Sequence, residues 1–304
     1  GGLTVMESQI IKMHDKGPTR VAPLFVPMAI GNMVAGNISM KIGARGICTS
    51  LVTACATGTH AIGEAFRNIK HGYSDVILAG GAEGSICEIG IAGFAALTAL
   101  SSSDNPDAAS LPFDKKRGGF VMGEGAGVLV LESLEHAQKR GAKIYAEVVG
   151  YGATGDAYHM TAPNPDGSGA GKAILQAIEE AGVAPSEVDY VNAHGTGTPA
   201  NDSAETTSIR YALKEAADKV HVSSTKSMTG HLLGAAGAIE AIACVKAVEE
   251  DFVPPTINLT EQDEACDLNV TPNVGVSTKV DVAISNSLGF GGHNAVICVK
   301  KWKD

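Results

Sequence analysis

The sequence predicts an α/β fold built from two similar halves. Short apolar strands alternate with helical segments along the 304 residues, which is typical of a largely parallel sheet with right-handed crossovers. One order of elements occurs twice, over residues 47–131 and 220–299. This order is a strand, a small-residue turn, a helix, an apolar strand and a glycine-flanked strand. The 37 glycines, set against 5% aromatic residues, indicate many tight turns and close backbone approaches. We therefore expect an N-terminal half over residues 1–141 and a C-terminal half over residues 142–304.

The first half contains three predicted strands. A helix over residues 55–71 follows from apolar side chains at helical spacing, among them Ile62 and Phe66, and Gly72 ends it. The run 75–81 is apolar and ends in glycines, which predicts a strand buried on both faces. Two further strands are expected over residues 47–54 and 125–131. A polar loop is expected over residues 101–112 and a helix end over residues 135–140.

The second half contains five predicted strands. They span residues 146–150, 188–193, 220–224, 282–285 and 295–299. Three helices are expected between them, over residues 169–181, 202–217 and 235–250. Because the second half has five strands and the first has three, we expect the first half to be incomplete at its N-terminus.

The composition excludes several classes of protein. A net charge of −10 argues against a nucleic-acid partner. No membrane partner is expected. The six cysteines are scattered without a CxxC pair, which argues against a disulfide framework and a metal site and indicates a reducing compartment. We therefore expect the protein to lie in the cytoplasm or in an organelle. We also expect its translation start to precede Gly1.

The segment Gly150-Tyr-Gly-Ala-Thr-Gly155 matches the GxGxxG pattern of dinucleotide-binding folds. That pattern requires a helix to begin directly after the glycines, with its N-terminus facing the pyrophosphate. Here Pro163 and Pro165 follow, and there is no helical stripe. The sequence favours an ordinary glycine-rich turn over a nucleotide site.

Cys55 is a candidate nucleophile because a predicted strand gives way to a predicted helix at this point. The positive end of a helix lowers the pKa of a thiol and favours the reactive thiolate. The small residues Ala54, Ala56 and Gly58 leave room for a substrate. A buried thiol that serves only packing remains the alternative.

Two histidines lie in settings similar to that of Cys55. His194 ends an apolar strand within His194-Gly-Thr-Gly-Thr198, and His231 lies between a strand and a helix. Ligands of open α/β sheets bind beyond the carboxyl ends of the strands. We therefore expect Cys55, His194 and His231 to meet at one edge if the two halves pack together. The other histidines lack such a setting and are interpreted as structural or surface residues.

The segment Asn286-Ser-Leu-Gly-Phe-Gly-Gly292 precedes the last strand. It predicts either a simple hairpin or a flexible loop that holds Phe290 and offers backbone N–H groups to a developing oxyanion.

Four motifs, taken together, resemble the condensing enzymes of the β-ketoacyl-acyl-carrier-protein synthase family, most of all its elongating branch, synthase II. These motifs are Thr53-Ala-Cys-Ala-Thr-Gly58, His194-Gly-Thr-Gly-Thr198, Lys226-Ser-Met-Thr-Gly-His231 and Gly289-Phe-Gly-Gly292. The resemblance extends over the whole chain. It implies a thiolase-like fold, with two α/β halves layered α-β-α-β-α, and a homodimer. Members of the family begin with a strand and helices that this sequence lacks before Gly1.

The resemblance also implies a role for each site residue. Cys55 would carry the acyl chain as a thioester, and His194 and His231 would donate hydrogen bonds to the malonyl thioester carbonyl. The backbone N–H groups of Cys55 and Phe290 would form the oxyanion hole. Three further roles follow for positions in the same motifs and near them. Lys226 and Glu205 would orient the histidines, Thr196 and Thr198 would contact the phosphopantetheine arm, and Phe290 would gate the acyl pocket.

The expected reaction is a decarboxylating Claisen condensation of the acyl-enzyme with malonyl-acyl-carrier protein, as in fatty-acid elongation. No cofactor or metal is bound permanently, because phosphopantetheine arrives on the carrier protein. Lys16 and Arg20 are candidates for docking that acidic partner. Thiolases fit less well because they carry a second Cys where the Phe290 loop stands, and initiating synthases have Asn in place of His231. The remaining alternative is a catalytically inactive fragment, or a non-catalytic module of the same fold that binds acyl groups or a partner.

Overall fold

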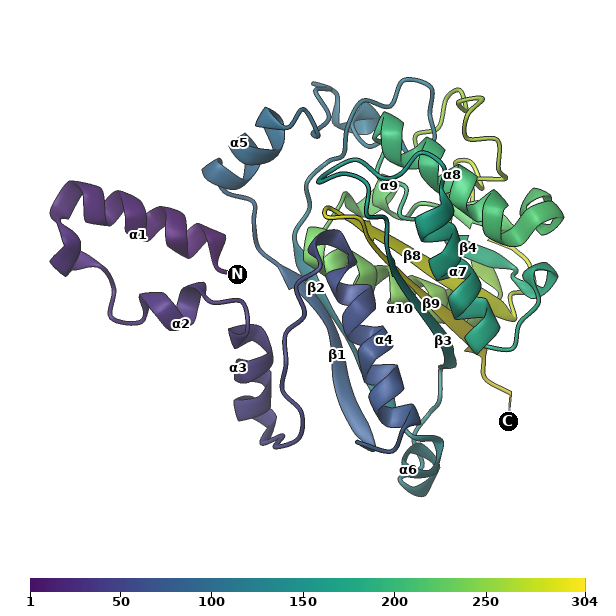
Figure 1. The fold of residues 1–304 in the computed structure, drawn as a ribbon, viewed down its shortest axis with the longest axis horizontal. Helices are drawn as coiled ribbons and strands as arrows, with labels where there is room; N and C mark the ends of the chain where they lie inside the picture. Colours follow the sequence, from purple (N-terminus) through teal and green to yellow (C-terminus); the bar gives the residue numbers. More distant parts are fainter. Residues whose placement is uncertain (304) are drawn as a thin grey trace.

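The computed structural model describes residues 1–303, and its core stacks two β-sheets and two layers of helices (Figure 1). Helices α4 (Thr57–Lys70) and α10 (Ala236–Glu250) lie between the sheets, since each contacts strands of both. Helices α7 (Ser168–Glu180) and α8 (Pro199–Leu213) pack on the far face of the larger sheet. This mixed architecture agrees with the predicted α/β class.

The larger sheet has five strands in the order β3-β9-β8-β4-β5. Their bounds are Ala146–Gly155, His293–Lys301, Val282–Gly289, Tyr190–Asn192 and His221–Ser223. Strand β4 runs parallel to β5 and β8, whereas β8 pairs with β9, and β9 with β3, in antiparallel register. The prediction of a largely parallel sheet is therefore wrong. The turn between β8 and β9 is too short for the crossover that parallel neighbours require.

The residues of the larger sheet alternate between two cores. Val191 and Ile284 belong to the apolar cluster that includes side chains of α7 and α8. Their chain neighbours Tyr190 and Ala283 belong to the cluster that includes side chains of α4 and α10. Successive residues of a strand face opposite sides, so burial on both faces fixes the sheet in the middle of the molecule.

The smaller sheet pairs β1 (Val76–Glu83) with β2 (Gly125–Glu132) in antiparallel register. Its inner face packs against the cluster between the sheets, for example through Ala79 and Leu129. On the outer face Val128 and Val130 are 47% and 58% exposed. The prediction that segment 75–81 is buried on both faces is therefore wrong, because no helix within residues 1–303 covers the outer face.

The predicted strand over residues 47–54 is also absent. Residues 47–53 have no strand partner within the described chain, and the 3₁₀-helix η2 (Ala54–Ala56) follows. In the second half, β5 reaches β8 only through β4. The described part of the first half has no counterpart of β4, so segment 47–53 has no neighbour that could supply ladder hydrogen bonds.

The GxGxxG segment lies inside β3, so the predicted glycine-rich turn is wrong and a nucleotide loop is excluded. Its glycines serve packing against α7. A Cβ at Gly150 would lie 2.0 Å from the carbonyl oxygen of Ala177, and one at Gly152 would lie 1.8 Å from that of Ala173. Glycine is therefore required for α7 to approach the strand this closely.

The remaining elements surround this core. The predicted helices 55–71, 169–181 and 235–250 are confirmed as α4, α7 and α10, and 202–217 as α8 followed by η5. Helices α1 to α3 form an arm beside the body (Figure 1), tied to it by a hydrogen bond from Thr4 Oγ1 to the carbonyl oxygen of Gly84. The other elements are α1 (Leu3–Lys16), η1 (Pro18–Arg20), α2 (Phe25–Ala29), α3 (Met33–Ile42), α5 (Glu88–Ala96), η3 (Pro106–Ala108), α6 (Leu134–Lys139), η4 (Pro185–Glu187), η5 (Lys214–Asp218), α9 (Lys226–Thr229), η6 (Leu233–Ala235), β6 (Phe252–Val253) and β7 (Val276–Ser277).

None of the helices within residues 1–303 has the length and apolar character needed to cross a membrane.

Candidate active site

Cys55 lies in the sharp turn that leads into α4. Ala54, directly before it, has a φ of 50°, in the left-handed region that L-residues rarely adopt. Thr57 holds this turn, since its Oγ1 donates to the carbonyl oxygen of Ala54 (2.7 Å) and accepts from the backbone N–H of Thr53 (3.0 Å). The predicted position of Cys55 at the start of a helix is confirmed.

The turn between β8 and β9 lies against the backbone of Cys55. A Cβ at Gly289 would lie 2.6 Å from the carbonyl oxygen of Thr53 and 3.3 Å from the backbone nitrogen of Cys55. Only glycine allows this approach. The turn is a hairpin, as one of the two interpretations predicted, and it places half-buried Phe290 beside the Cys55 turn.

The two histidines meet beyond the carboxyl ends of the parallel strands β4 and β5. Their ring centroids lie 5.1 Å apart at an interplanar angle of 87°, and both side chains are buried. Cys55 packs in a small apolar cluster with Phe120 and Leu233. Phe120 lies edge-on to His231 at 5.1 Å, and Leu233 contacts the same ring. The expectation that Cys55, His194 and His231 converge is confirmed.

The hydrogen bonds of the two histidines define their tautomers. The backbone N–H of Leu233 donates to Nδ1 of His231 (3.3 Å), and Lys226 Nζ donates to Nδ1 of His194 (3.3 Å). Burial, and then the Lys226 charge, hold both histidine pKa values well below the ordinary value. A neutral imidazole whose Nδ1 accepts carries its proton on Nε2. The site therefore presents two Nε2–H donors.

Lys226 is held by a residue that sequence reasoning missed. Its buried ammonium forms an ion pair with Glu240 of α10 while it donates to His194. Glu240 lies on the same helix face as the buried residues Gly237, Ala241 and Cys244. A single acidic residue on the buried face of a small-residue helix was the signal in the sequence, because a buried carboxylate requires a partner.

Glu205 acts differently from the prediction. Its carboxylate accepts from the backbone N–H groups of His194 and Gly195 (both 2.7 Å) and from Nδ2 of Asn286 (3.3 Å). It therefore holds the main chain of His194 and contacts neither imidazole ring. Burial raises the pKa of Glu205 to about 7. The prediction that Glu205 orients both histidines is corrected: it positions the backbone of one.

Thr196 and Thr198 flank Gly197 in the turn after His194. Their hydroxyl oxygens lie 2.9 Å apart. Gly195 and Gly197 have φ values of 37° and 78°, which explains the glycines at these positions.

A chain of aromatic rings extends from the histidines to the hairpin. Phe120 packs edge-on against Phe94 at 5.3 Å, and Phe94 lies 6.4 Å from Phe290. Phe94 and Leu100 line the cluster that contains Cys55. The sequence did not single out Phe94 or Phe120, because neither belongs to a motif. Together they provide an apolar wall beside the thiol.

Burial dominates the ionisation of Cys55. It raises the pKa of the thiol to about 12, although the nearby Lys226 charge lowers it. This burial opposes the effect of the helix N-terminus, which the sequence predicts to lower the pKa of Cys55 and to favour its thiolate.

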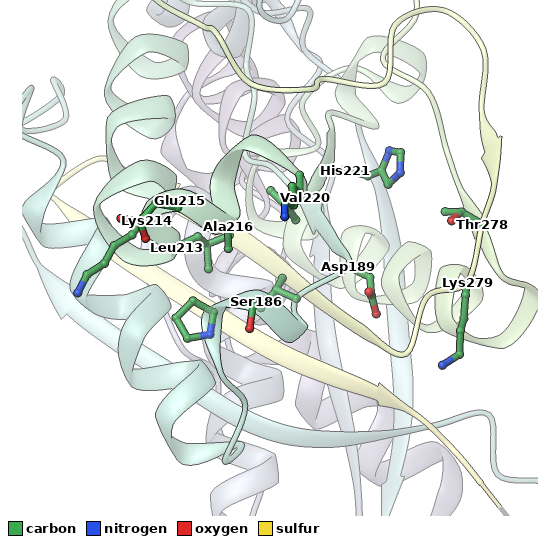
Figure 2. Close-up of a pocket in the computed structure, with 13 residues that line it drawn as sticks. Ser186, Asp189, Leu213, Lys214, Glu215, Ala216, Val220, His221, Thr278 and Lys279 are labelled. Carbon is green, nitrogen blue, oxygen red and sulfur yellow. The ribbon is translucent and has the colours of Figure 1, made fainter.

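A cavity of about 600 Å³ lies elsewhere (Figure 2). It is formed at the opposite ends of β4 and β5 from the histidines, beside Asp189 and His221. Of its three lysines, Lys214 and Lys279 stand at opposite sides in Figure 2 and do not converge on one point. Cys55, His194 and His231 do not line this cavity.

Comparison with known proteins identifies this arrangement. Residues 2–137 match the family model for the N-terminal domain of β-ketoacyl synthases, and residues 145–260 match that for the C-terminal domain. A 3-oxoacyl-acyl-carrier-protein synthase 2 of Synechocystis sp. is 54% identical over all 304 residues, which cover 73% of that protein. The chain belongs to the β-ketoacyl synthase family. The protein of the same name from Staphylococcus aureus is 52% identical over 303 residues, and the chain again covers 73% of its length.

Solved β-ketoacyl synthase structures have the same fold. A ketosynthase of a type II polyketide synthase, in complex with its acyl-carrier protein and bound to a hexaketide, superposes with a TM-score of 0.96 at 39% identity, over 98% of this chain and 75% of that chain. The ishigamide ketosynthase/chain length factor gives 0.91 at 40% identity, over 99% and 72%. These neighbours confirm the predicted thiolase-like fold. The chain is accordingly a β-ketoacyl synthase, an acyltransferase.

Proposed function

We propose that this β-ketoacyl synthase elongates fatty-acyl chains by decarboxylating Claisen condensation of an acyl group on Cys55 with malonyl-acyl-carrier protein. The observation that carries the proposal is the pair of neutral Nε2–H imidazoles beside a buried thiol. The 3-oxoacyl-acyl-carrier-protein synthase 2 relatives, at 52–54% identity, are named for this activity.

Acyl transfer comes first. The sulfur of Cys55 attacks the thioester carbonyl of acyl-carrier protein, and the bond between that carbonyl and the phosphopantetheine sulfur breaks. The departing thiolate takes up the proton that Cys55 loses. Backbone N–H groups of Cys55 and Phe290 stabilise the oxyanion, since the hairpin packs against the Cys55 turn. The apolar wall of Phe94 and Phe120 receives the acyl chain.

Decarboxylation follows on the malonyl thioester. Its carbonyl oxygen accepts hydrogen bonds from Nε2–H of His194 and of His231. These two fixed donors stabilise the negative charge that develops on this oxygen. The carbon–carbon bond to the carboxylate breaks and carbon dioxide leaves. The electron pair of that bond stays on the thioester and forms the enolate. The Lys226–Glu240 pair keeps the ring of His194 in the donating tautomer.

The enolate carbon then attacks the acyl-Cys55 carbonyl. A carbon–carbon bond forms, the carbon–sulfur bond breaks and Cys55 leaves as a thiolate. Because burial raises the Cys55 pKa to about 12, the thiolate recovers a proton from water, which restores the starting state. The β-ketoacyl product remains on the carrier protein.

The partner is acyl-carrier protein in its acyl and malonyl forms. We assign Thr196 and Thr198 to its phosphopantetheine arm, and exposed Lys16 and Arg20 to its acidic surface. The solved ketosynthase in complex with its acyl-carrier protein supports the choice of partner. We further propose a homodimer in the cytoplasm or an organelle. No resident cofactor or metal enters the scheme, since two imidazoles supply the donors.

Product analysis tests the proposed function. The chain is incubated with acyl- and malonyl-acyl-carrier protein, and β-ketoacyl-carrier protein is measured by mass spectrometry. Cys55→Ser should lose condensation, whereas Cys48→Ser, which changes an exposed thiol, should retain it. Equal product from Cys55→Ser would contradict the assignment, and acyl binding without product from the unmodified chain would favour the non-catalytic module.

A further inference from the structure

Arg117 is a buried cation that none of the steps above uses. Its side chain is 4% exposed, although it lies in the irregular segment between α5 and β2. Nη1 donates to Oδ2 of Asp263 (2.5 Å), and Nη2 donates to the carbonyl oxygen of Pro199, the first residue of α8 (3.2 Å). Nε faces the carboxylate of Asp202 at 3.7 Å and has no hydrogen-bond partner within residues 1–303. The guanidinium thus joins three separate segments of the chain.

Asp202 connects Arg117 to the turn after His194. Its carboxylate accepts from the backbone N–H of Gly197 at Oδ1 (3.2 Å) and from that of Phe113 at Oδ2 (2.8 Å). Complete burial raises the pKa of Asp202, and the Arg117 charge acts in the opposite direction. Because an ionised carboxylate only accepts, Arg117 favours the form of Asp202 that holds both amides.

The turn between His194 and Thr198 therefore has two separate anchors. Glu205 holds the histidine end through the N–H groups of His194 and Gly195. Asp202 holds the threonine end through Gly197, and the Arg117 segment adds a bond from Gly119 N to the carbonyl oxygen of Gly197 (3.1 Å). Loss of one anchor leaves the other in place.

We propose that Arg117 is a positioning residue for the carrier-bound phosphopantetheine arm: through Asp202 it fixes the end of the turn that presents Thr196 and Thr198. The proposal rests on the proposed function, from which it takes the role of the two threonines. Thr196 and Thr198 stand directly before and after Gly197, and their hydroxyl oxygens lie 2.9 Å apart. A shift of Gly197 therefore displaces both hydroxyls. Without Arg117, carrier-bound substrate binds more weakly, while the chemistry at Cys55 and the histidines continues.

Steady-state kinetics with malonyl-acyl-carrier protein test this. Arg117→Met should raise KM about tenfold, the effect of losing one hydrogen bond of about 1.4 kcal/mol, and leave kcat within about threefold. Arg117→Lys keeps the charge opposite Asp202 and should give a smaller KM increase. Arg210→Met is the matched control. Arg210 lies in the last turn of α8, the helix that also carries Asp202, and like Arg117 it bridges two carboxylates, those of Asp218 and Asp267. This variant should change neither constant.

Alkylation of Cys55 by iodoacetamide, which needs no carrier arm, should proceed at the unmodified rate in both Arg117 variants. An unchanged KM, or a kcat that falls while KM holds, overturns the proposal. If Arg117→Met does not fold, the KM-against-kcat split of Arg117→Lys decides. An unmodified chain that neither loads an acyl group nor releases carbon dioxide contradicts the proposed function itself, and the role of Arg117 falls with it.

Discussion

Each half contains a helix followed by a pair of antiparallel strands, but only in the second half are both faces of the strand pair covered. In the first half α4 precedes the paired strands β1 and β2, and in the second α10 precedes β8 and β9. Val128 and Val130 of β2 are 47% and 58% exposed, whereas Val296 and Cys298 of β9 are 2% and 0% exposed. The strands are similar in sequence, and coverage by α7 and α8 makes the difference.

The comparison also explains how the site is divided. Cys55 precedes α4 and His231 precedes α10, so the repeated unit supplies the nucleophile from one half and a hydrogen-bond donor from the other. His194 follows β4, which has no counterpart in the described part of the first half. The second half therefore contributes both imidazole donors, and the first half contributes the thiol.

Removing either donor from the second half should have the largest effect. His194→Ala and His231→Ala should each slow release of carbon dioxide from malonyl-acyl-carrier protein about 10²–10³-fold, because a fixed donor to the enolate oxygen is lost. His221→Ala is the control, since His221 lies at the opposite end of β5 from His231. An unchanged rate of carbon dioxide release in either of these variants would contradict the assignment of both donors to the second half.

Core substitutions should separate the halves by stability. Ile284→Ala, in the fully buried strand β8, should lower the free energy of unfolding by about 2–5 kcal/mol. Val130→Ala, on the uncovered face of β2, should change it by less than about 0.5 kcal/mol. Urea denaturation measures both. Equal losses would mean that the outer face of β2 is covered in solution.

The thiol of the first half should show its burial in its pH dependence. With a pKa of about 12, the thiolate fraction of Cys55 is small at pH 7 and rises about tenfold per pH unit. The alkylation rate of Cys55, followed by peptide mass spectrometry, should therefore keep rising above pH 9. A rate that levels off near neutral pH would show that Cys55 is a ready thiolate after all.

The hairpin of the second half should affect loading of the first-half thiol only modestly. Phe290→Ala removes the ring beside Phe94 and should change the rate of acyl loading a few-fold, with less discrimination between short and long chains. Loading rates that stay unchanged for all chain lengths would make Phe290 a packing residue.

Local patterns in the sequence predicted what local forces determine. Helices α4, α7 and α10 follow from their apolar spacing, and the turns around Cys55, His194 and His231 follow from their small residues. Long-range packing explains the errors. Gly150 and Gly152 resemble a turn until α7 is placed against them, and segment 47–53 resembles a strand although it has no neighbour. The spacing of residues did not reveal Glu240, because its partner Lys226 comes from another element.

The most direct test of the central claim follows the acyl group on Cys55 in the His194→Ala/His231→Ala double variant. Intact-mass measurement after incubation with acyl-carrier protein bearing the acyl chain should find Cys55 loaded in both the unmodified chain and the double variant, since loading uses the thiol and its backbone N–H groups. After malonyl-acyl-carrier protein is added, the unmodified chain should lose the acyl mass to β-ketoacyl product, and the double variant should retain it. Transfer at the unmodified rate in the double variant would contradict the claim that the two neutral imidazoles drive the condensation.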